Sequence, residues 1–379
     1  MFSNNLLMAA AGGGDAGYVI ENSLLLNDDD SPYMSKTLST PTSSTKFSFS
    51  VWYKRGNITT QMFLLGASPT NGYIMFQDDK ITFYPTLGSG YQLVTTPMYR
   101  DPTAWQHGLF VYDSDNGTAN DRMKMYINGT EVTVFGTRTN PASGTASSIN
   151  SAVEHRIGEP VHESGKHWDG YLSQICLIDG QVLDATSFGE FDDQGYWRPI
   201  DLSGLTFGTN GFLLDFAVAP GTGDGAGTDV SGNDNHFTDS GLTASDQVSD
   251  TPTNDAENGI GNYCTWNPPA SPSATFTAGN LAATGFNTAV ATDKVCGTIP
   301  LPLTGKHYFE VHSTGYTGDD CSVGIMPIEV QDGRSYNAGD NFVLYQANVT
   351  PSVWPYFQTL IDGVTTNTDQ PQINNTAFV

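Results

Sequence analysis

The first chemistry to test is glycoside hydrolysis, because two carboxylates can protonate a leaving oxygen and attack as nucleophile. On a strand, an alternating pattern such as Glu-x-Asp-x-Glu would place such acids on one face. The nearest string is Glu190-Phe191-Asp192-Asp193-Gln194, which lacks the second glutamate. We therefore predict no hydrolysis by Glu190, Asp192 or Asp193, and we expect a protein that is not an enzyme.

Histidines are the next candidates for chemistry. His162 and His167 share the polar loop 159–167 (EPVHESGKH) with a glutamate between them. Pro160 and Gly165 break the helical geometry that an H-E-x-x-H zinc site needs, so we interpret this segment as a surface loop. The sequence also has no nucleophile elbow, P-loop or dinucleotide-binding motif, which agrees with a non-catalytic protein.

Calcium is the one ion for which the residue pattern makes a case. Four aspartates recur about every five residues in a glycine-rich stretch: Asp224, Asp229, Asp234 and Asp239. Carboxylate oxygens on flexible backbone are the ligands that Ca²⁺ takes, although the bidentate glutamate of an EF-hand is missing. We keep these four residues as a candidate calcium site, with no other cofactor expected.

Aromatic side chains could serve as platforms for sugar rings. Trp52, Trp105 and Trp168 lie in apolar strand-like runs, where packing is the better interpretation. The candidates for ligand contact are the aromatics in turn-rich stretches, with packing at a rim as the alternative: Tyr91, Tyr99, Trp197, Trp354 and Tyr356.

Composition limits the fold and the partners. The chain has 379 residues, which argues for two or three domains. Its 40 acidic against 15 basic residues give a formal charge of −25, so we predict no binding to nucleic acid. Glycine (41) and proline (20) are enriched, which suits many turns between short strands. No run is apolar enough to span a membrane, and we predict no membrane insertion.

Short apolar or alternating runs predict strands between residues 17 and 200. In Phe47–Tyr53 (FSFSVWY), bulky apolar residues alternate with a mixed set, which is typical of a sheet face over a core. Asn128-Gly129 between two such runs predicts a tight hairpin. Antiparallel hairpins imply a sandwich, with these side chains inside: Phe49, Val51, Trp105, Phe110, Tyr126 and Ile175.

The chain divides into four parts by composition. Residues 1–16 suit an anchor that orders on docking, and residues 17–200 a jelly-roll sandwich. Residues 201–270 are rich in Gly, Asp, Asn, Ser and Thr, so we predict a connector that wraps or links. Strand-like runs resume in residues 271–379, which predicts a second, incomplete β-sandwich. The fold class is therefore all-β.

Four motifs carry a family resemblance. The runs 47–56 (FSFSVWYKRG), 105–112 (WQHGLFVY), 123–130 (MKMYINGT) and 168–183 (WDGYLSQICLIDGQVL) resemble the ordered strands of a laminin-G-like, concanavalin A-type jelly roll. Laminin-G-like domains often hold calcium at a loop rim, so the resemblance implies calcium here.

The C-terminal part carries a second resemblance. Residues 305–324 (GKHYFEVHSTGYTGDDCSVG) are similar to the opening of a SPRY-like sandwich, whose later strand pattern is missing before Val379. The join at residues 243–268 resembles a linker of tailed-bacteriophage virion proteins that carry this domain pair.

Together the resemblances imply a structural virion protein without catalysis, assembled in the host cytoplasm. We expect a tail-fibre or appendage subunit that binds a host cell-surface glycan, other virion proteins and itself, with a trimer favoured by analogy. The alternative is a capsid-surface or neck subunit that acts through protein-protein contacts. A polysaccharide depolymerase is a weaker third hypothesis.

Overall fold

The computed structural model describes residues 17–67, 72–86, 90–270, 274–285 and 295–300, together with positions 309 and 311 and the backbone of four later strands. The chain forms two compact units, of which the first comprises Met1–Thr265 with Phe276–Ala282. The second comprises Trp266–Thr275 with Ala283–Val379. Apart from six short 3₁₀ turns, the regular elements of the described residues are strands, so the predicted all-β fold is confirmed.

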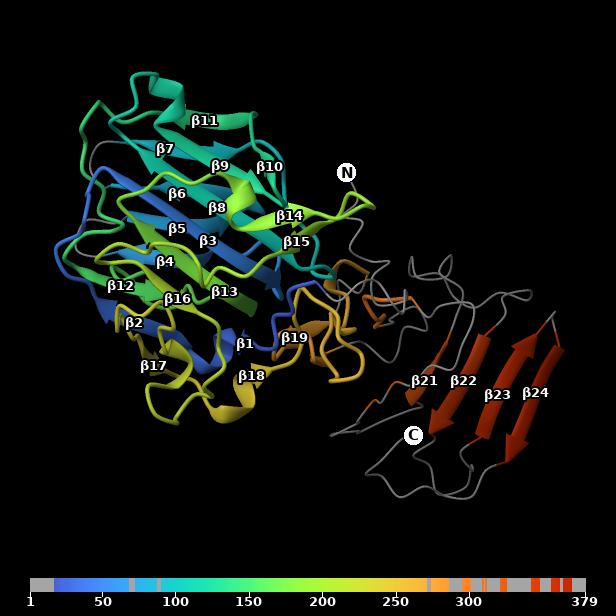
Figure 1. The fold of residues 1–379 in the computed structure, drawn as a ribbon. Coiled ribbons are helices and arrows are strands. Elements are labelled where there is room, and N and C mark those ends of the chain that lie inside the picture. The colour runs from blue at the N-terminus through green and yellow to red at the C-terminus, as the bar shows by residue number, and fades with distance from the viewer. Residues whose placement is uncertain are drawn as a thin grey trace. The chain divides into compact units, whose positions relative to one another are not determined.

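The first sheet of the N-terminal unit is antiparallel and is built around two long strands, β3 (Lys46–Arg55) and β13 (Gly170–Asp179). Its strand order is β10-β9-β8-β3-β13-β1-β18, and β16 also pairs with β13 (Figure 1). The other strands of this sheet are β1 (Ser23–Leu26), β8 (Gln106–Asp113), β9 (Met123–Ile127), β10 (Thr130–Glu131), β16 (Phe212–Leu214) and β18 (Gln247–Val248).

The second sheet of this unit is also antiparallel and has the order β11-β7-β6-β5-β4-β12-β2-β17 (Figure 1). Its strands are β2 (Tyr33–Thr37), β4 (Met62–Ala67), β5 (Gly72–Gln77), β6 (Lys80–Tyr84), β7 (Gln92–Thr95), β11 (Phe135–Thr139), β12 (Glu154–Ile157) and β17 (Thr238–Ser240).

The main core lies between the two sheets, and aromatic contacts join them. Phe83 of the second sheet packs edge-to-face on Phe47 and Phe110 of the first, with ring centroids 6.2 and 5.7 Å away. Four of the six residues predicted inside the sandwich lie in this core: Phe49, Val51, Phe110 and Ile175. Trp105 is also buried, but in a second cluster outside it. The prediction for Tyr126 is wrong, because this side chain is only half-buried against a second cluster.

That second cluster covers the outer face of the first sheet. The hairpin of β14 (Gly189–Phe191) and β15 (Trp197–Pro199) and the residues on either side of it place Phe188, Trp197 and Leu202 in one cluster with Trp52. The alternation in β3 therefore separates two cores, because both faces of this strand are buried. The predicted hairpin at Asn128-Gly129 is present, and both residues have positive φ (48° and 73°).

Residues 201–265 are part of the same compact unit as the jelly roll, so the unit continues past the predicted boundary at residue 200. The segment lends β16 and β18 to the first sheet and β17 to the second. It also buries apolar side chains in the clusters of the sandwich, among them Phe212, Phe216 and Phe237 in the main core. Backbone pairing and this burial together order the segment. The segment wraps the sandwich.

The described backbone of the second unit contains an antiparallel sheet of order β21-β22-β23-β24. Its strands are β21 (Cys321–Ile325), β22 (Phe342–Ala347), β23 (Tyr356–Ile361) and β24 (Val364–Asp369). A separate two-stranded sheet is formed by β19 (Thr275–Thr277) and β20 (Ala282–Thr284), whose residues the division assigns partly to each unit. Most of the run 305–324, which carries the SPRY-like resemblance, lies outside the described residues. In the part of the chain that is described, no helix is long and apolar enough to cross a membrane.

Candidate functional site

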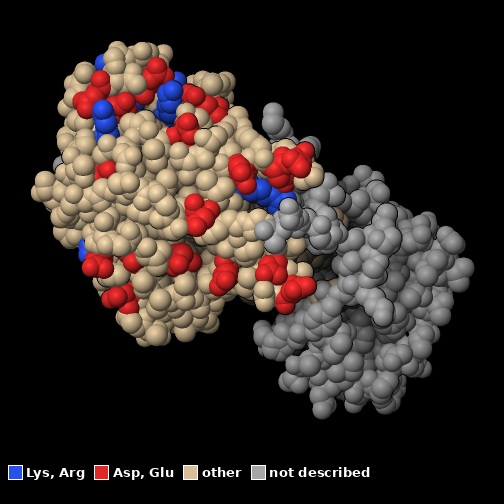
Figure 2. All heavy atoms as spheres, in the orientation of Figure 1, with Lys and Arg blue, Asp and Glu red and all other residues tan. Residues whose placement is uncertain are grey.

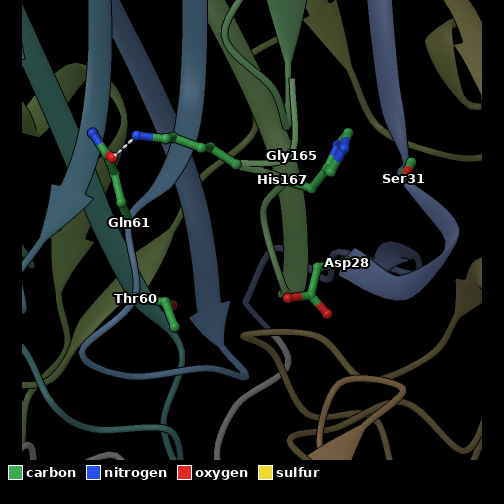
Figure 3. A pocket seen from close by; sticks show the side chains of 7 residues that line it. Asp28, Ser31, Thr60, Gln61, Gly165 and His167 are labelled. Carbon is green, nitrogen blue, oxygen red and sulfur yellow. Dashed lines mark hydrogen bonds between the residues drawn. The ribbon is translucent and has the colours of Figure 1, made fainter. Parts of the chain in front are cut away.

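A pocket of about 450 Å³ opens where three loops of the jelly-roll unit meet (Figure 3). One loop follows β1, the second leads into β4, and the third connects β12 with β13. Six of its seven lining residues carry a hydrogen-bonding side chain; the seven are Asp28, Ser31, Thr60, Gln61, Gly165, Lys166 and His167. Its volume falls within the roughly 300–1,000 Å³ of ligand sites.

Side-chain hydrogen bonds hold the first two loops in place. The loop after β1 closes through a 2.8 Å hydrogen bond from Asn27 to the Asp30 carboxylate, and Ser31 ends it with a positive φ of 54°. In the second loop, the backbone N–H of Thr59 donates to the buried Asp79 carboxylate (2.7 Å). Asp79 thereby fixes the neighbouring Thr60 at the pocket wall.

The third loop is anchored by a buried acid. Glu159 is 3% exposed and accepts a 2.7 Å hydrogen bond from Arg156 of β12. Its other carboxylate oxygen lies 3.6 Å from Nε2 of His167. At the loop's end, Lys166 donates to Gln61 across the pocket and pairs with Glu163 at 3.1 Å (Figure 3). The third loop is therefore tied to the second one.

Two acids at or beside the pocket, Asp28 and Asp169, have raised pKa values. Asp169 lies just before β13 and is 2% exposed, and burial together with the charge of Asp28 raises its pKa to about 7. Burial and the charge of Asp29 also raise the pKa of Asp28, although its carboxylate accepts a 3.0 Å hydrogen bond from Asn57. Nearby positive charge does not offset burial at either carboxyl, so the uncharged form of both acids is favoured relative to an exposed aspartate.

An aromatic cluster adjoins the pocket on the outer side of the second sheet. The rings of Tyr73 and Tyr84 stack with centroids 5.0 Å apart, and His162 stacks on Tyr73 at 6.4 Å. His162 belongs to the third pocket loop, and Gln61 donates to the sulfur of Met75 on β5 (3.3 Å). The polar pocket thus continues into a wall of half-exposed rings.

Three of the five aromatic residues proposed from the sequence as ligand contacts lie in the described part of the chain, and two of these, Tyr99 and Trp197, belong to different clusters. Trp197 is 5% exposed, and its indole N–H donates to Nδ1 of His107 (3.1 Å) inside the second cluster. Tyr99 packs against the main core and Tyr91 is half-buried. Trp354 and the side chain of Tyr356 lie outside the described residues.

Two of the four aspartates of the candidate calcium stretch, Asp229 and Asp239, accept several backbone hydrogen bonds. Asp229 accepts from the backbone N–H groups of Leu213, Ser231 and Asn235. Asp239 accepts from two further backbone N–H groups, at residues 226 and 227. Asp224 and Asp234 are exposed and lie 3.9 and 3.8 Å from His236. Within the described ranges, no group of three His, Cys, Asp or Glu side chains could hold a metal ion.

The acids of residues 190–193 lie on the β14–β15 hairpin. Asp192 binds Arg198 (2.7 Å), and it caps the turn by accepting from the backbone N–H groups of Gln194 and Tyr196. These bonds lower the pKa of Asp192 despite some desolvation. A carboxylate used in this way is a structural acid, and Glu190 beside it is exposed.

Sequence reasoning reached only part of the pocket. It singled out loop 159–167 for its histidines, and the structure places His167 in the pocket and His162 in the adjoining cluster. It missed Asp28, Gln61 and Asp169. The signal that was available was the run Asn27–Asp30 directly after an apolar strand, since acids that end a strand commonly face a loop rim.

Comparison with known proteins identifies a domain within the chain. The model of the concanavalin A-like lectin/glucanases superfamily matches residues 28–185. Solved structures with a similar fold include a Bacteroides ovatus protein (13% identity, TM-score 0.41, 60% of each chain covered). Domains LG4-5 of the mouse laminin α1 chain also match (13% identity, TM-score 0.31, 46% of this chain and 48% of that chain).

A third similar structure is the CBM40 of Ruminococcus gnavus IT-sialidase bound to α2,3-sialyllactose (11% identity, TM-score 0.30, 44% of this chain and 95% of that chain). The chain thus spans 60% and 48% of the length of the first two structures. No curated protein matches the chain. The superfamily match confirms the laminin-G-like resemblance of the N-terminal motifs, whereas the SPRY-like character of the C-terminal part stays a prediction.

Proposed function

We propose that the laminin-G-like jelly roll of this chain is a glycan-binding module and that the pocket is its sugar site. The observation that carries the proposal is the lining of the pocket, which mixes donors and acceptors in a small volume. Lys166 is a donor, Asp28 an acceptor, and Ser31, Thr60 and Gln61 can be both. Sugar hydroxyl groups also donate and accept, so a polyhydroxylated ligand matches this lining.

The charge of the pocket favours a neutral glycan over an acidic one. Lys166 is already paired with Glu163, and His167 faces Glu159. Asp28 adds a carboxylate to the lining, and the whole chain carries a formal charge of −25. Figure 2 shows acidic side chains spread over one face of the jelly-roll unit, with basic ones in a few places. This field repels sulfated and carboxylated sugars.

A glycan array probed with the full chain tests the proposal. Gln61→Ala removes an amide that can bond to a sugar hydroxyl, which should weaken binding about tenfold, the effect of roughly 1.4 kcal/mol. The matched control is Gln194→Ala, because Gln194 is exposed on the β14–β15 hairpin. Neutral glycans should be retained by the wild type and the control. Equal affinity of Gln61→Ala and wild type, or no retained glycan, would refute the assignment.

The module is proposed to bind without cleaving. The support is the structural use of Asp192 by Arg198 and the turn of its own hairpin. Incubation with the glycans that the array retains should release no new reducing ends. Release that disappears in Asp192→Asn would make the protein a depolymerase instead.

We further propose that the protein is a virion structural subunit, and we favour a tail-fibre or appendage protein that self-associates. The support is the set of N-terminal motifs, the linker and the succession of two β units in one chain. Labelling of intact particles with an antibody against the jelly-roll unit should mark a tail appendage. Label confined to the capsid surface or neck would favour the alternative position on the particle.

A further inference from the structure

Asp169 is a buried acid that lies where two of the pocket loops meet. It is 2% exposed, and its Oδ1 has no hydrogen-bond partner among the described residues. The backbone N–H groups of Asp28 and Asn57 act on its carboxyl, so it lies between the loop after β1 and the loop that leads into β4. Asn57 also donates to the Asp28 carboxylate (3.0 Å), which joins the two loops beside Asp169.

Both of these loops carry residues that line the pocket (Figure 3). The loop after β1 supplies Asp28 and Ser31, and the loop that leads into β4 supplies Thr60 and Gln61. Four of the seven lining residues therefore lie on the two loops that meet at Asp169. A change at this one carboxyl can reach both walls of the pocket.

The backbone packs directly against Asp169. A Cβ at Gly56 would lie 2.2 Å from its Oδ2, and the N–H of Gly56 donates to its backbone carbonyl (2.9 Å). Gly170 follows with a φ of 123°, and a Cβ on it would lie 2.3 Å from the carbonyl oxygen of Lys54. Bulk water can hydrate an ionised Asp169 only if these packed segments separate.

The acids near Asp169 oppose its ionisation. Burial has the largest effect, and together with the charges of Asp28 and Asp29 it raises the pKa of Asp169 to about 7. His167 on the same segment acts on Asp28, and it also faces the carboxylate of Glu159 at 3.6 Å. The Asp169 carboxyl is therefore mostly uncharged below about pH 7 and mostly charged above it.

The basic groups of the neighbouring elements do not compensate the charge of Asp169. Lys54 and Arg55 at the end of β3 each pair with another buried carboxylate. Lys166 of the third pocket loop pairs with a glutamate of its own loop. Tyr171 on β13 lies in the field of Asp169, but burial raises the pKa of its hydroxyl, so it stays neutral.

We propose that Asp169 is a positioning residue that makes the sugar pocket sensitive to pH. While its carboxyl is uncharged, the loop after β1 stays against the loop that leads into β4, and the pocket is formed. When the carboxyl releases its proton to solvent, repulsion from Asp28 and hydration of the new charge separate the two loops. Glycan binding should therefore weaken as the pH rises. This coupling rests on the proposed sugar site, whereas the movement of the loops does not.

A pH series of glycan binding by the full chain provides the first test. Affinity for a neutral glycan retained on the array should fall about tenfold between pH 6 and pH 9, the effect of a one-unit change in the pKa of Asp169 on binding. Asp169→Asn cannot ionise, so its affinity should be equal at both pH values. Asp29→Asn should move the midpoint of the fall to lower pH, because the exposed Asp29 raises the pKa of Asp169. The matched control Asp234→Asn removes an exposed carboxylate elsewhere and should keep the wild-type midpoint.

Hydrogen–deuterium exchange without ligand provides the second test. After correction for the intrinsic exchange rate, amides of residues 27–31 and 56–61 should lose protection between pH 6 and pH 9 in wild type but not in Asp169→Asn. This loss in a chain that binds no glycan would refute the sugar site and still support the loop movement. A fall in affinity that persists in Asp169→Asn, or binding and protection that do not change with pH, would overturn the proposal. If Asp169→Asn does not fold, the midpoint of Asp29→Asn decides, and an unchanged midpoint counts against the proposal.

Discussion

Two neighbouring regions of the jelly-roll unit differ in whether their buried charged side chains are paired. At the end of β3, Lys54 and Arg55 are each 1% exposed in their side chains, and each meets a buried carboxylate. Lys54 lies 2.8 Å from Asp250, and Arg55 lies 3.1 Å from Asp79. Both charges are compensated from within the chain, even though two guanidinium nitrogens of Arg55 have no hydrogen-bond partner among the described residues.

Asp169, which lies close to the end of β3 on the neighbouring strand β13, has no such ion pair. It is buried to the same degree, but no described basic side chain pairs with it. Charges matched inside the chain hold segments together, as Asp250 does by also accepting the indole N–H of Trp105 (2.8 Å). Without such a partner, burial and the charge of Asp28 raise the pKa of Asp169 to about 7, and strongly shifted pKa values occur more often at functional sites. The comparison thus separates structural acids from a candidate functional one.

The strongest test of the comparison places an unmatched charge in the core. Phe49 is 0% exposed and packs on Phe110. Phe49→Asp loses roughly 1.5–3 kcal/mol of apolar burial and adds the far larger cost of an unpaired carboxylate. We expect no folded protein by circular dichroism and solubility. Phe49→Leu is the control and should fold, whereas a soluble Phe49→Asp variant with cooperative melting would contradict the fold.

Breaking one matched pair should have the next largest effect. Asp250→Ala leaves the Lys54 ammonium buried without its carboxylate, which should lower the free energy of unfolding by about 3–5 kcal/mol. Urea denaturation measures it. Glu257→Ala in the same loop is the control, because Glu257 is exposed. The double variant Lys54→Met/Asp250→Leu should recover much of the loss. A loss no greater than that of Glu257→Ala would mean that the pair is not structural.

Local patterns predicted the parts of the fold that local physics decides. Alternation in 47–53 identified a strand with two distinct faces, and Asn128-Gly129 identified its hairpin because few residues adopt positive φ. No local pattern predicted where residues 201–265 attach, because their three short strands pair with strands that come together only in the folded sandwich. Composition could show only that this segment depends on another for order.

The candidate site was harder to predict for the same reason. Asp28 and Asp169 are 141 residues apart, and nothing local marks either as buried or unpaired. The stretch from Asp224 to Asp239 looked more like an ion site in sequence. In the structure the buried Asp229 and the partly buried Asp239 already accept hydrogen bonds from backbone N–H groups. Whether a carboxylate is free to bind an ion depends on tertiary contacts that spacing does not record.

Two buried histidines that stay neutral, His107 and His155, should make the protein less stable at low pH, and this effect should be of intermediate size. Burial lowers the pKa of His107 to about 3 and that of His155 to about 4. Below pH 6.5 the unfolded chain therefore binds protons that the folded chain does not. As the pH is lowered, the free energy of unfolding decreases by about 1.4 kcal/mol per pH unit for each histidine. This loss continues until the folded pKa is reached.

Urea denaturation between pH 7 and pH 4.5 measures the effect. His107→Gln should remove about half of the histidine contribution to this slope, whatever it costs at pH 7 through the lost contacts with Ser50 and Trp197. His162→Gln is the control, because His162 is half-exposed in the pocket loop. A slope in His107→Gln equal to that of wild type would show that His107 does not resist protonation.

The smallest effect is expected where a matched pair meets solvent. Lys166 and Glu163 lie 3.1 Å apart, with side chains 33% and 39% exposed. Water and salt screen such a pair, so Glu163→Gln should change the free energy of unfolding by only about 0.2–1 kcal/mol, and 1 M NaCl should remove most of the difference. The buried Asp250 pair is the internal control, because its loss should persist in salt. A loss of several kcal/mol in the free energy of unfolding of Glu163→Gln that persists in salt would show that exposed and buried ion pairs do not differ in strength here. It would also show that loop 159–167 is held by its surface charge and not by the buried Glu159.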